Sequence, residues 1–205
     1  MAALPMLSRT RLLRAGVLVS VAWLMGCRKP VSFHATDLTG TELDREGMAQ
    51  SLVDHTGQPR RLADFRGKVV VLFFGYTQCP DVCPTVLALM RQAMDMLGSD
   101  GQRVQILFVT IDPERDTQAL LAQYLPLFHP TFLGLRGDSA ATASIAKAFK
   151  INYEKRPGAT AGQYAMDHST GSYVLDAKGR LRLYFAHDEK AATIVDDLRQ
   201  LIDQA

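Results

Sequence analysis

Cysteine is scarce in this chain, tryptophan is almost absent, and neither sign of charge dominates. The 205 residues contain 3 Cys and 1 Trp, and the formal net charge is only +2 at pH 7. Because the Lys and Arg residues are scattered rather than grouped in blocks, the sequence gives no indication of a nucleic-acid or polybasic membrane surface. There is also no low-complexity tract and no internal repeat, which is typical of one ordinary domain.

The apolar stretch near the N-terminus is too short for an ordinary transmembrane helix. It covers residues 15–25, about eleven residues, which is the length of a signal-peptide core. It ends in Leu24-Met25-Gly26-Cys27, which resembles a bacterial lipobox, where the Cys is lipidated and becomes the new N-terminus. The basic residues that precede it are Arg9, Arg11 and Arg14.

These features predict an exported lipoprotein held at a membrane by acyl chains on Cys27. We expect residues 1–26 to be a lipoprotein signal peptide, residues 27–46 a lipidated N-terminus and tether, and residues 47–205 the folded domain. An uncleaved signal anchor with an incidental cysteine is the alternative. Either way, we expect the domain to face the periplasm or another extracytoplasmic space, anchored to the inner membrane.

If Cys27 carries lipid, Cys79 and Cys83 are left in the domain, and an oxidising space allows them to form a disulfide. A bridge over so short a loop constrains little of the unfolded chain, so chemistry explains the pair better than stabilisation does. An apolar run at 69–74 predicts a buried strand before the pair, and residues 85–97 predict a helix after it. Because helix N-termini stabilise thiolates, we expect the pKa of these cysteines to be lowered.

The remaining hydrophobic patterns alternate between strand and helix. Strand–helix–strand units followed by a hairpin and a helix predict a mixed α/β fold. With a Cys pair at the first strand-to-helix junction, this is the thioredoxin-like arrangement: a central mixed sheet flanked by helices, with a C-terminal β-hairpin and helix. The expected strands are 104–110, 132–135, 172–175 and 181–185, and the expected helices are 117–127, a helix capped by Asp138, and 190–202.

Residues 73–84, which read FFGYTQCPDVCP, resemble the signature of the Sco/SenC family of copper chaperones for cytochrome oxidase assembly. Three further segments match in order, namely VTIDPERDT at 109–117, DHS at 167–169, and LD with GRL between 175 and 181. The resemblance covers roughly residues 51–205. Gln78 stands where family members often carry His. That position is not a ligand in the family, so the difference bears on how the properties of the site are tuned rather than on whether it binds metal.

The resemblance implies a thioredoxin-like fold in which Cys79, Cys83 and His168 bind copper. It further implies a metallochaperone, rather than an enzyme, that delivers copper to the dinuclear copper centre of cytochrome c oxidase. Implied partners are the copper-bearing oxidase subunit, an upstream copper donor and a thiol reductant. Asp167 is a candidate to support the imidazole from outside the ligand set, and Asp81 to cap the helix or contact a partner.

The residues alone leave the chemistry more open. Two thiolates and one imidazole suit Cu(I), can hold Cu(II) in a more tetragonal arrangement, and can also bind Zn²⁺. By itself, His168 is more typical of a surface or core residue than of a ligand. We expect three loop residues, Asp112, Arg115 and Asp116, to form an ion network that shapes the surroundings of the site.

A thiol-disulfide oxidoreductase is the main alternative, with Cys79 and Cys83 as a redox-active disulfide. The Cys-x₃-Cys spacing differs from the usual Cys-x₂-Cys, and no Pro after Pro157 can supply the cis-Pro of thioredoxins. The Pro-x₃-Thr-x₂-Cys arrangement of peroxiredoxins is also missing around Cys79, which argues against a thiol peroxidase.

Overall fold

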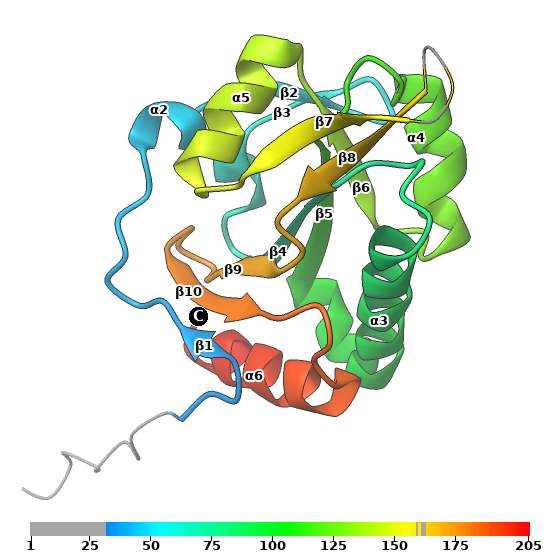
Figure 1. Cartoon of the computed structure of the whole chain (residues 1–205). Helices are drawn as coiled ribbons and strands as arrows, with labels where there is room; N and C mark the ends of the chain where they lie inside the picture. The colour runs from blue at the N-terminus through cyan, green and yellow to red at the C-terminus, as the bar shows by residue number, and fades with distance from the viewer. Residues whose placement is uncertain (1–31, 159, 161–162) are drawn as a thin grey trace, which may run out of the picture. The chain divides into compact units, whose positions relative to one another are not determined.

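The structure, a computed structural model, describes residues 32–158, 160 and 163–205 (Figure 1). The expected signal peptide and the lipidation site Cys27 lie outside these residues. Residues 33–205 form one compact unit. None of the helices in the described part of the chain has the length and apolar character needed to cross a bilayer.

A mixed sheet of eight strands forms the centre of this unit (Figure 1). The strands are β1 (Thr36–Asp37), β2 (Leu52–Asp54), β3 (Pro59–Arg60), β4 (Val69–Gly75), β5 (Val104–Thr110), β6 (Leu133–Arg136), β9 (Ser172–Leu175) and β10 (Leu181–Phe185). Their order is β1-β10-β9-β4-β5-β6-β2-β3, with β4, β5 and β6 parallel and the other pairs antiparallel. Every residue of β4 and β5 is buried, as expected for central strands covered on both faces.

The helices cover the sheet, with α3 packed against α6 and α2 against α5. The α-helices are α2 (Arg45–Met48), α3 (Val82–Leu97), α4 (Gln118–Tyr124), α5 (Ser139–Ala148) and α6 (Ala191–Asp203), and the 3₁₀-helices are η2 (Leu62–Phe65), η3 (Gly98–Arg103) and η4 (Leu125–Leu127). Asp138 caps α5 as predicted, since its side chain accepts a hydrogen bond from the Ala141 amide at 2.8 Å. The predicted thioredoxin-like fold, with its C-terminal hairpin and helix, is confirmed.

The N-terminal segment differs from the expected tether over residues 27–46. Thr36 and Asp37 pair with β10, so the chain has joined the sheet well before residue 47. The buried carboxylate of Asp197 in α6 fixes this segment, because it accepts hydrogen bonds from the amides of His34 and Ala35 at 2.8–3.1 Å. The folded unit therefore begins at Phe33.

A second sheet carries one of the predicted ligands. It consists of β7 (Tyr153–Pro157) and β8 (Tyr164–His168), which pair only with each other in the described chain. The sequence analysis did not predict these strands. Their residues are mostly exposed, so they lack the apolar alternation that marks a half-buried strand.

Candidate metal centre

The cysteine arm of the site is the loop between β4 and α3, together with the first turn of that helix. Cys83 is the second residue of α3 and is fully buried, whereas Cys79 lies in the loop and is partly exposed. The Cys83 amide donates a hydrogen bond to the Cys79 sulfur over 3.5 Å. Gly75 makes room for this arrangement, because a Cβ there would lie only 2.7 Å from the Cys83 sulfur.

The histidine arm is the end of β8. Nε2 of His168 lies 3.5 Å from the Cys83 sulfur, and Nδ1 lies 2.8 Å from the carbonyl oxygen of Ser169. A carbonyl only accepts hydrogen bonds, so Nδ1 must carry a proton, and in the neutral ring Nε2 then presents its lone pair to the sulfurs. The rings of Tyr76 and Phe73 meet the imidazole edge-on and fix its plane.

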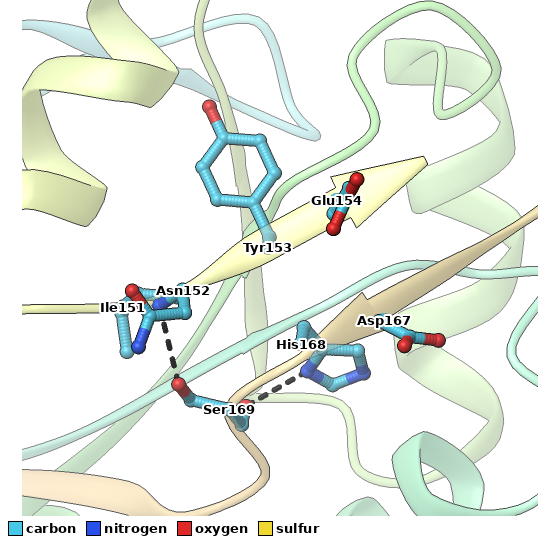
Figure 2. A pocket seen from close by; sticks show the side chains of 7 residues that line it. All are labelled: Ile151, Asn152, Tyr153, Glu154, Asp167, His168 and Ser169. Atoms are coloured by element: carbon cyan, nitrogen blue, oxygen red, sulfur yellow. Dashed lines mark hydrogen bonds between the residues drawn. The ribbon is translucent and has the colours of Figure 1, made fainter. Parts of the chain in front are cut away.

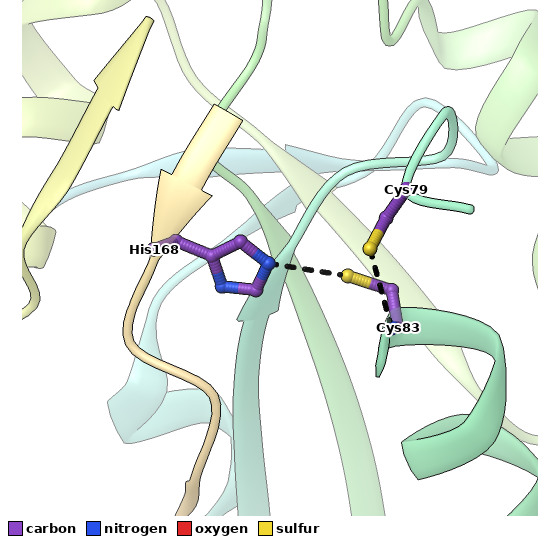
Figure 3. Close-up of side chains that lie close together, drawn as sticks. All are labelled: Cys79, Cys83 and His168. Atoms are coloured by element: carbon purple, nitrogen blue, oxygen red, sulfur yellow. Dashed lines mark hydrogen bonds between the residues drawn. The ribbon is translucent and has the colours of Figure 1, made fainter. Parts of the chain in front are cut away.

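The three predicted ligands converge at one point (Figure 3). The two sulfurs and a ring nitrogen of His168 all lie within 4.8 Å of one another, and no other such group of three or more occurs among the residues that the structure describes. Metal bonds of about 2.3 Å to sulfur and about 2.0 Å to nitrogen separate neighbouring ligand atoms by roughly 3.5–4.3 Å. The observed spread therefore needs only a small contraction to surround one ion.

The two thiols have opposite acidities. The hydrogen bond from the Cys83 thiol, together with the backbone amides of Asp81 and Cys83, lowers the pKa of Cys79 to about 4. For Cys83, the hydrogen bond of its thiol to Cys79 and the burial of its side chain raise the pKa. The expectation that both cysteines are acidified is thus right for Cys79 and wrong for Cys83, because two adjacent sulfurs in a buried site share one negative charge.

The predicted ion network beside the cysteine arm is present in part, since Asp112 pairs with Arg115 whereas Asp116 bonds to neutral groups. The carboxylate of Asp116 is buried and accepts hydrogen bonds from the Thr77 amide, the Thr77 hydroxyl and the Thr110 hydroxyl. Burial raises the pKa of this carboxyl group. Asp112 pairs with Arg115. These contacts hold the start of the cysteine loop against the end of β5.

The two residues proposed to support the ligands lie elsewhere than expected. The Asp167 carboxylate pairs with Arg156 across the hairpin, and the Ser169 carbonyl contacts the imidazole in its place. Asp81 stands at the N-cap of α3 without a side-chain capping bond, and it acts on Cys79 through its backbone amide. Every residue type offers the same backbone amide and carbonyl groups, apart from the missing N–H of proline. The sequence therefore could not indicate these backbone contacts.

An open groove of about 650 Å³ runs along the outer side of the histidine arm (Figure 2). His168 is among the residues that line this groove, whereas neither cysteine is. Its other lining residues are Ile151, Asn152, Tyr153, Glu154, Asp167 and Ser169.

Two relatives that are similar in sequence to this chain are mitochondrial SCO2 homologues. The mouse protein named "Protein SCO2 homolog, mitochondrial" is 40% identical over 154 residues, which cover 74% of this chain and 60% of that protein. The bovine protein of the same name is 40% identical over 152 residues, which cover 73% and 57%. This chain thus matches about three fifths of the length of these relatives.

Two solved structures share the fold at appreciable identity. ScoI of Bradyrhizobium japonicum with copper bound is 35% identical, with a TM-score of 0.70, over 74% of this chain and 96% of that one. Apo Sco1 of Thermus thermophilus is 39% identical, with a TM-score of 0.72, over 83% and 97%. The SCO1/SenC family model matches residues 39–203, and the chain therefore belongs to the SCO1/SenC family.

Proposed function

We propose that this chain is a copper metallochaperone that binds the ion through Cys79, Cys83 and His168. The observation that carries the proposal is the convergence of two sulfurs and one imidazole nitrogen within 4.8 Å. This soft donor set suits Cu(I), and relatives with copper bound share the fold. The cysteines must be reduced to load the ion, because thiolates rather than disulfide sulfurs are metal ligands.

The test is titration of the reduced full-length chain, in detergent, with Cu(I). We expect one ion per chain, and loss of tight binding in Cys79→Ser, Cys83→Ser and His168→Ala alike. His187→Ala is the matched control, because His187 is exposed and contacts Thr170 rather than the sulfurs. Zinc is tested in parallel, since two Cys and one His also suit Zn²⁺, and stronger binding of zinc than of copper would overturn the assignment.

The acceptor that we propose is the dinuclear copper centre of cytochrome c oxidase. Membership of the family supports this, and so does the partial exposure of Cys79 and His168, through which an incoming ligand can reach the ion. Incubation of the copper-loaded chain with the apo form of the copper-bearing oxidase subunit should transfer copper and develop that centre's absorption. Transfer no faster than from free copper with the same subunit would contradict a delivery role.

We further propose that the chain is tethered to a membrane as a lipoprotein, with residues 1–26 removed and Cys27 lipidated. The short apolar core and the lipobox-like end at Cys27 support this. Expression in a bacterium with labelled palmitate should give a labelled mature protein in the inner-membrane fraction, facing the periplasm. Labelling that persists in Cys27→Ala would contradict it.

A thiol-disulfide oxidoreductase is a second candidate, favoured by the lowered pKa of Cys79. The same variants separate the two functions. Rapid reduction of insulin, together with tight copper binding that survives His168→Ala, would favour the oxidoreductase.

A further inference from the structure

The histidine arm and the cysteine arm are not joined by a β-ladder. Cys79 and Cys83 follow β4 of the large sheet, whereas His168 ends a hairpin whose strands pair only with each other in the described chain. Nevertheless, Nε2 of His168 lies 3.5 Å from the Cys83 sulfur. Apart from its chain connections, the hairpin is therefore positioned relative to the cysteines by side-chain contacts.

Several of these contacts centre on Tyr164, at the opposite end of β8 from His168. Its hydroxyl donates to Asp112 at 2.7 Å. The guanidinium of Arg115 lies 3.6 Å from the centre of its ring and donates from Nη1 to its carbonyl oxygen at 2.8 Å. Stacking and hydrogen bonding together fix both the side chain and the backbone of this residue.

Arg115 also contacts the cysteine arm. Its Nη1 donates to Oε1 of Gln78 at 3.2 Å, directly before Cys79. Its own position is fixed because Nε pairs with the buried Asp112 carboxylate, and only 20% of its side chain is exposed. Thus a single guanidinium touches both arms of the site.

We infer that Arg115 is a positioning residue that aligns the β7–β8 hairpin with the cysteine loop, so that the His168 nitrogen meets the two sulfurs. This inference rests on the proposed copper site. Since β8 spans only Tyr164–His168, fixing its first residue limits the directions in which its last residue can point. An ion pair also joins the hairpin to the loop after β5, between Lys155 and Glu114, but it is largely exposed and contributes little.

The test compares Arg115→Gln with Arg156→Gln in the full-length reduced chain. Arg156 is the matched control, because it lies on the same hairpin and pairs with Asp167 of that hairpin rather than with the rest of the domain. We expect Arg115→Gln to weaken Cu(I) binding about tenfold, the order found for groups that orient metal ligands, and the control to leave it unchanged. Competition with a coloured Cu(I) chelator measures both.

A double-mutant cycle with His168→Ala asks whether Arg115 acts through the histidine. In the His168→Ala background, Arg115→Gln should no longer weaken Cu(I) binding, because there is no imidazole left to position. Equal losses in both backgrounds, or Arg115→Gln behaving like Arg156→Gln, would overturn the inference. Arg115→Lys should also weaken binding, since it keeps the charge but cannot make the stacked and forked contacts.

Amide hydrogen exchange of the metal-free chain gives a readout that does not depend on copper. We expect β8 amides to exchange faster in Arg115→Gln and at the normal rate in Arg156→Gln. If the unaltered chain binds no copper, the proposed function fails, while faster exchange of β8 still supports the alignment and unchanged exchange refutes it. Should Arg115→Gln not fold, Tyr164→Phe, which loses only the hydroxyl bond to Asp112, takes its place with a smaller effect of the same sign.

Discussion

The backbone amide of Cys83 points at the sulfur of Cys79, 3.5 Å away, and with the Cys83 thiol it stabilises a thiolate there. The two cysteines, which lie on the same loop and first helical turn, therefore differ in charge in the metal-free protein. Cys79 is the charged and partly exposed member of the pair, and Cys83 is the neutral and buried one.

This difference predicts unequal alkylation by iodoacetamide in the reduced chain. Because the pKa of Cys79 is lowered from 9.0 to about 4, its thiolate is fully formed above that pH. Its reaction rate should be constant between about pH 5 and pH 8, whereas an ordinary thiol reacts about tenfold faster for each pH unit there. Cys83 should stay unmodified while the chain is folded, since its pKa is raised and it is buried.

Mass spectrometry of peptides at each pH measures both rates. Cys83→Ala serves as the control for the origin of the shift, because it removes the thiol that donates to Cys79. The rate of Cys79 in that variant should fall near neutral pH. A rate for Cys79 in the unaltered chain that rises steadily from pH 6 to pH 8 would contradict the structure.

Gly75→Ala should damage the site without replacing a ligand. The new Cβ would meet the Cys83 sulfur at 2.7 Å and the rings of Phe73 and Phe108 at 3.0 Å, in a fully buried place. Overpacking of this kind costs about 1–3 kcal/mol of stability, and here it also displaces a sulfur. We expect weaker Cu(I) binding together with a lower midpoint of urea unfolding.

Gly101→Ala is the control for this substitution, since the nearest atom to its Cβ would be the end of the Met94 side chain at 3.3 Å, and no proposed ligand lies within 4 Å of it. It should leave Cu(I) affinity unchanged whatever it does to stability. Equal Cu(I) affinities of Gly75→Ala and the unaltered chain would show that Cys83 does not depend on this glycine.

Asp197→Asn should loosen the N-terminal segment. The Asp197 carboxylate accepts from two backbone amides, of His34 and Ala35, and an amide side chain has one oxygen to offer and two donors of its own. Leaving a buried donor unpaired costs about 1–3 kcal/mol. The loss should appear in urea unfolding, and exchange of the Ala35 amide should become faster.

Asp196→Asn tests whether burial or charge is responsible. Asp196 is the neighbouring residue, is 61% exposed, and lies 4.0 Å from the ring of His34. Its substitution should change stability by only a few tenths of a kcal/mol, which is typical of exposed pairs. Similar losses in the two variants would mean that the buried hydrogen bonds do not hold β1.

The parts of the fold that sequence predicts well are those with local signals. Such signals span only a few residues. They are the apolar runs of β4 and β5, the capping Asp138 of α5, and Gly179 in the turn of the hairpin. β1 has no such signal, because its two residues are exposed and are held only by pairing with β10 and by a carboxylate far along the chain. Such tertiary contacts override local propensity.

The same distinction between local signals and tertiary contacts applies to the site. A short motif predicts the cysteine loop. His168 is predicted only by the family resemblance, because nothing in the residues around a single histidine indicates that it is a ligand. The opposite acidities of Cys79 and Cys83 depend on burial and on one hydrogen bond, which the spacing of the motif cannot specify. Arg115 was expected in an ion network, but its link between the two arms depends on where a separate hairpin lies.

Full burial of Cys83 beside a partly exposed Cys79 gives the proposed copper handover a direction. An acceptor approaching from outside would reach the outer sulfur and the imidazole before the inner sulfur, so the bond to Cys83 would be the last to break. Release would then replace one donor at a time, and the ion would not have to be free in water.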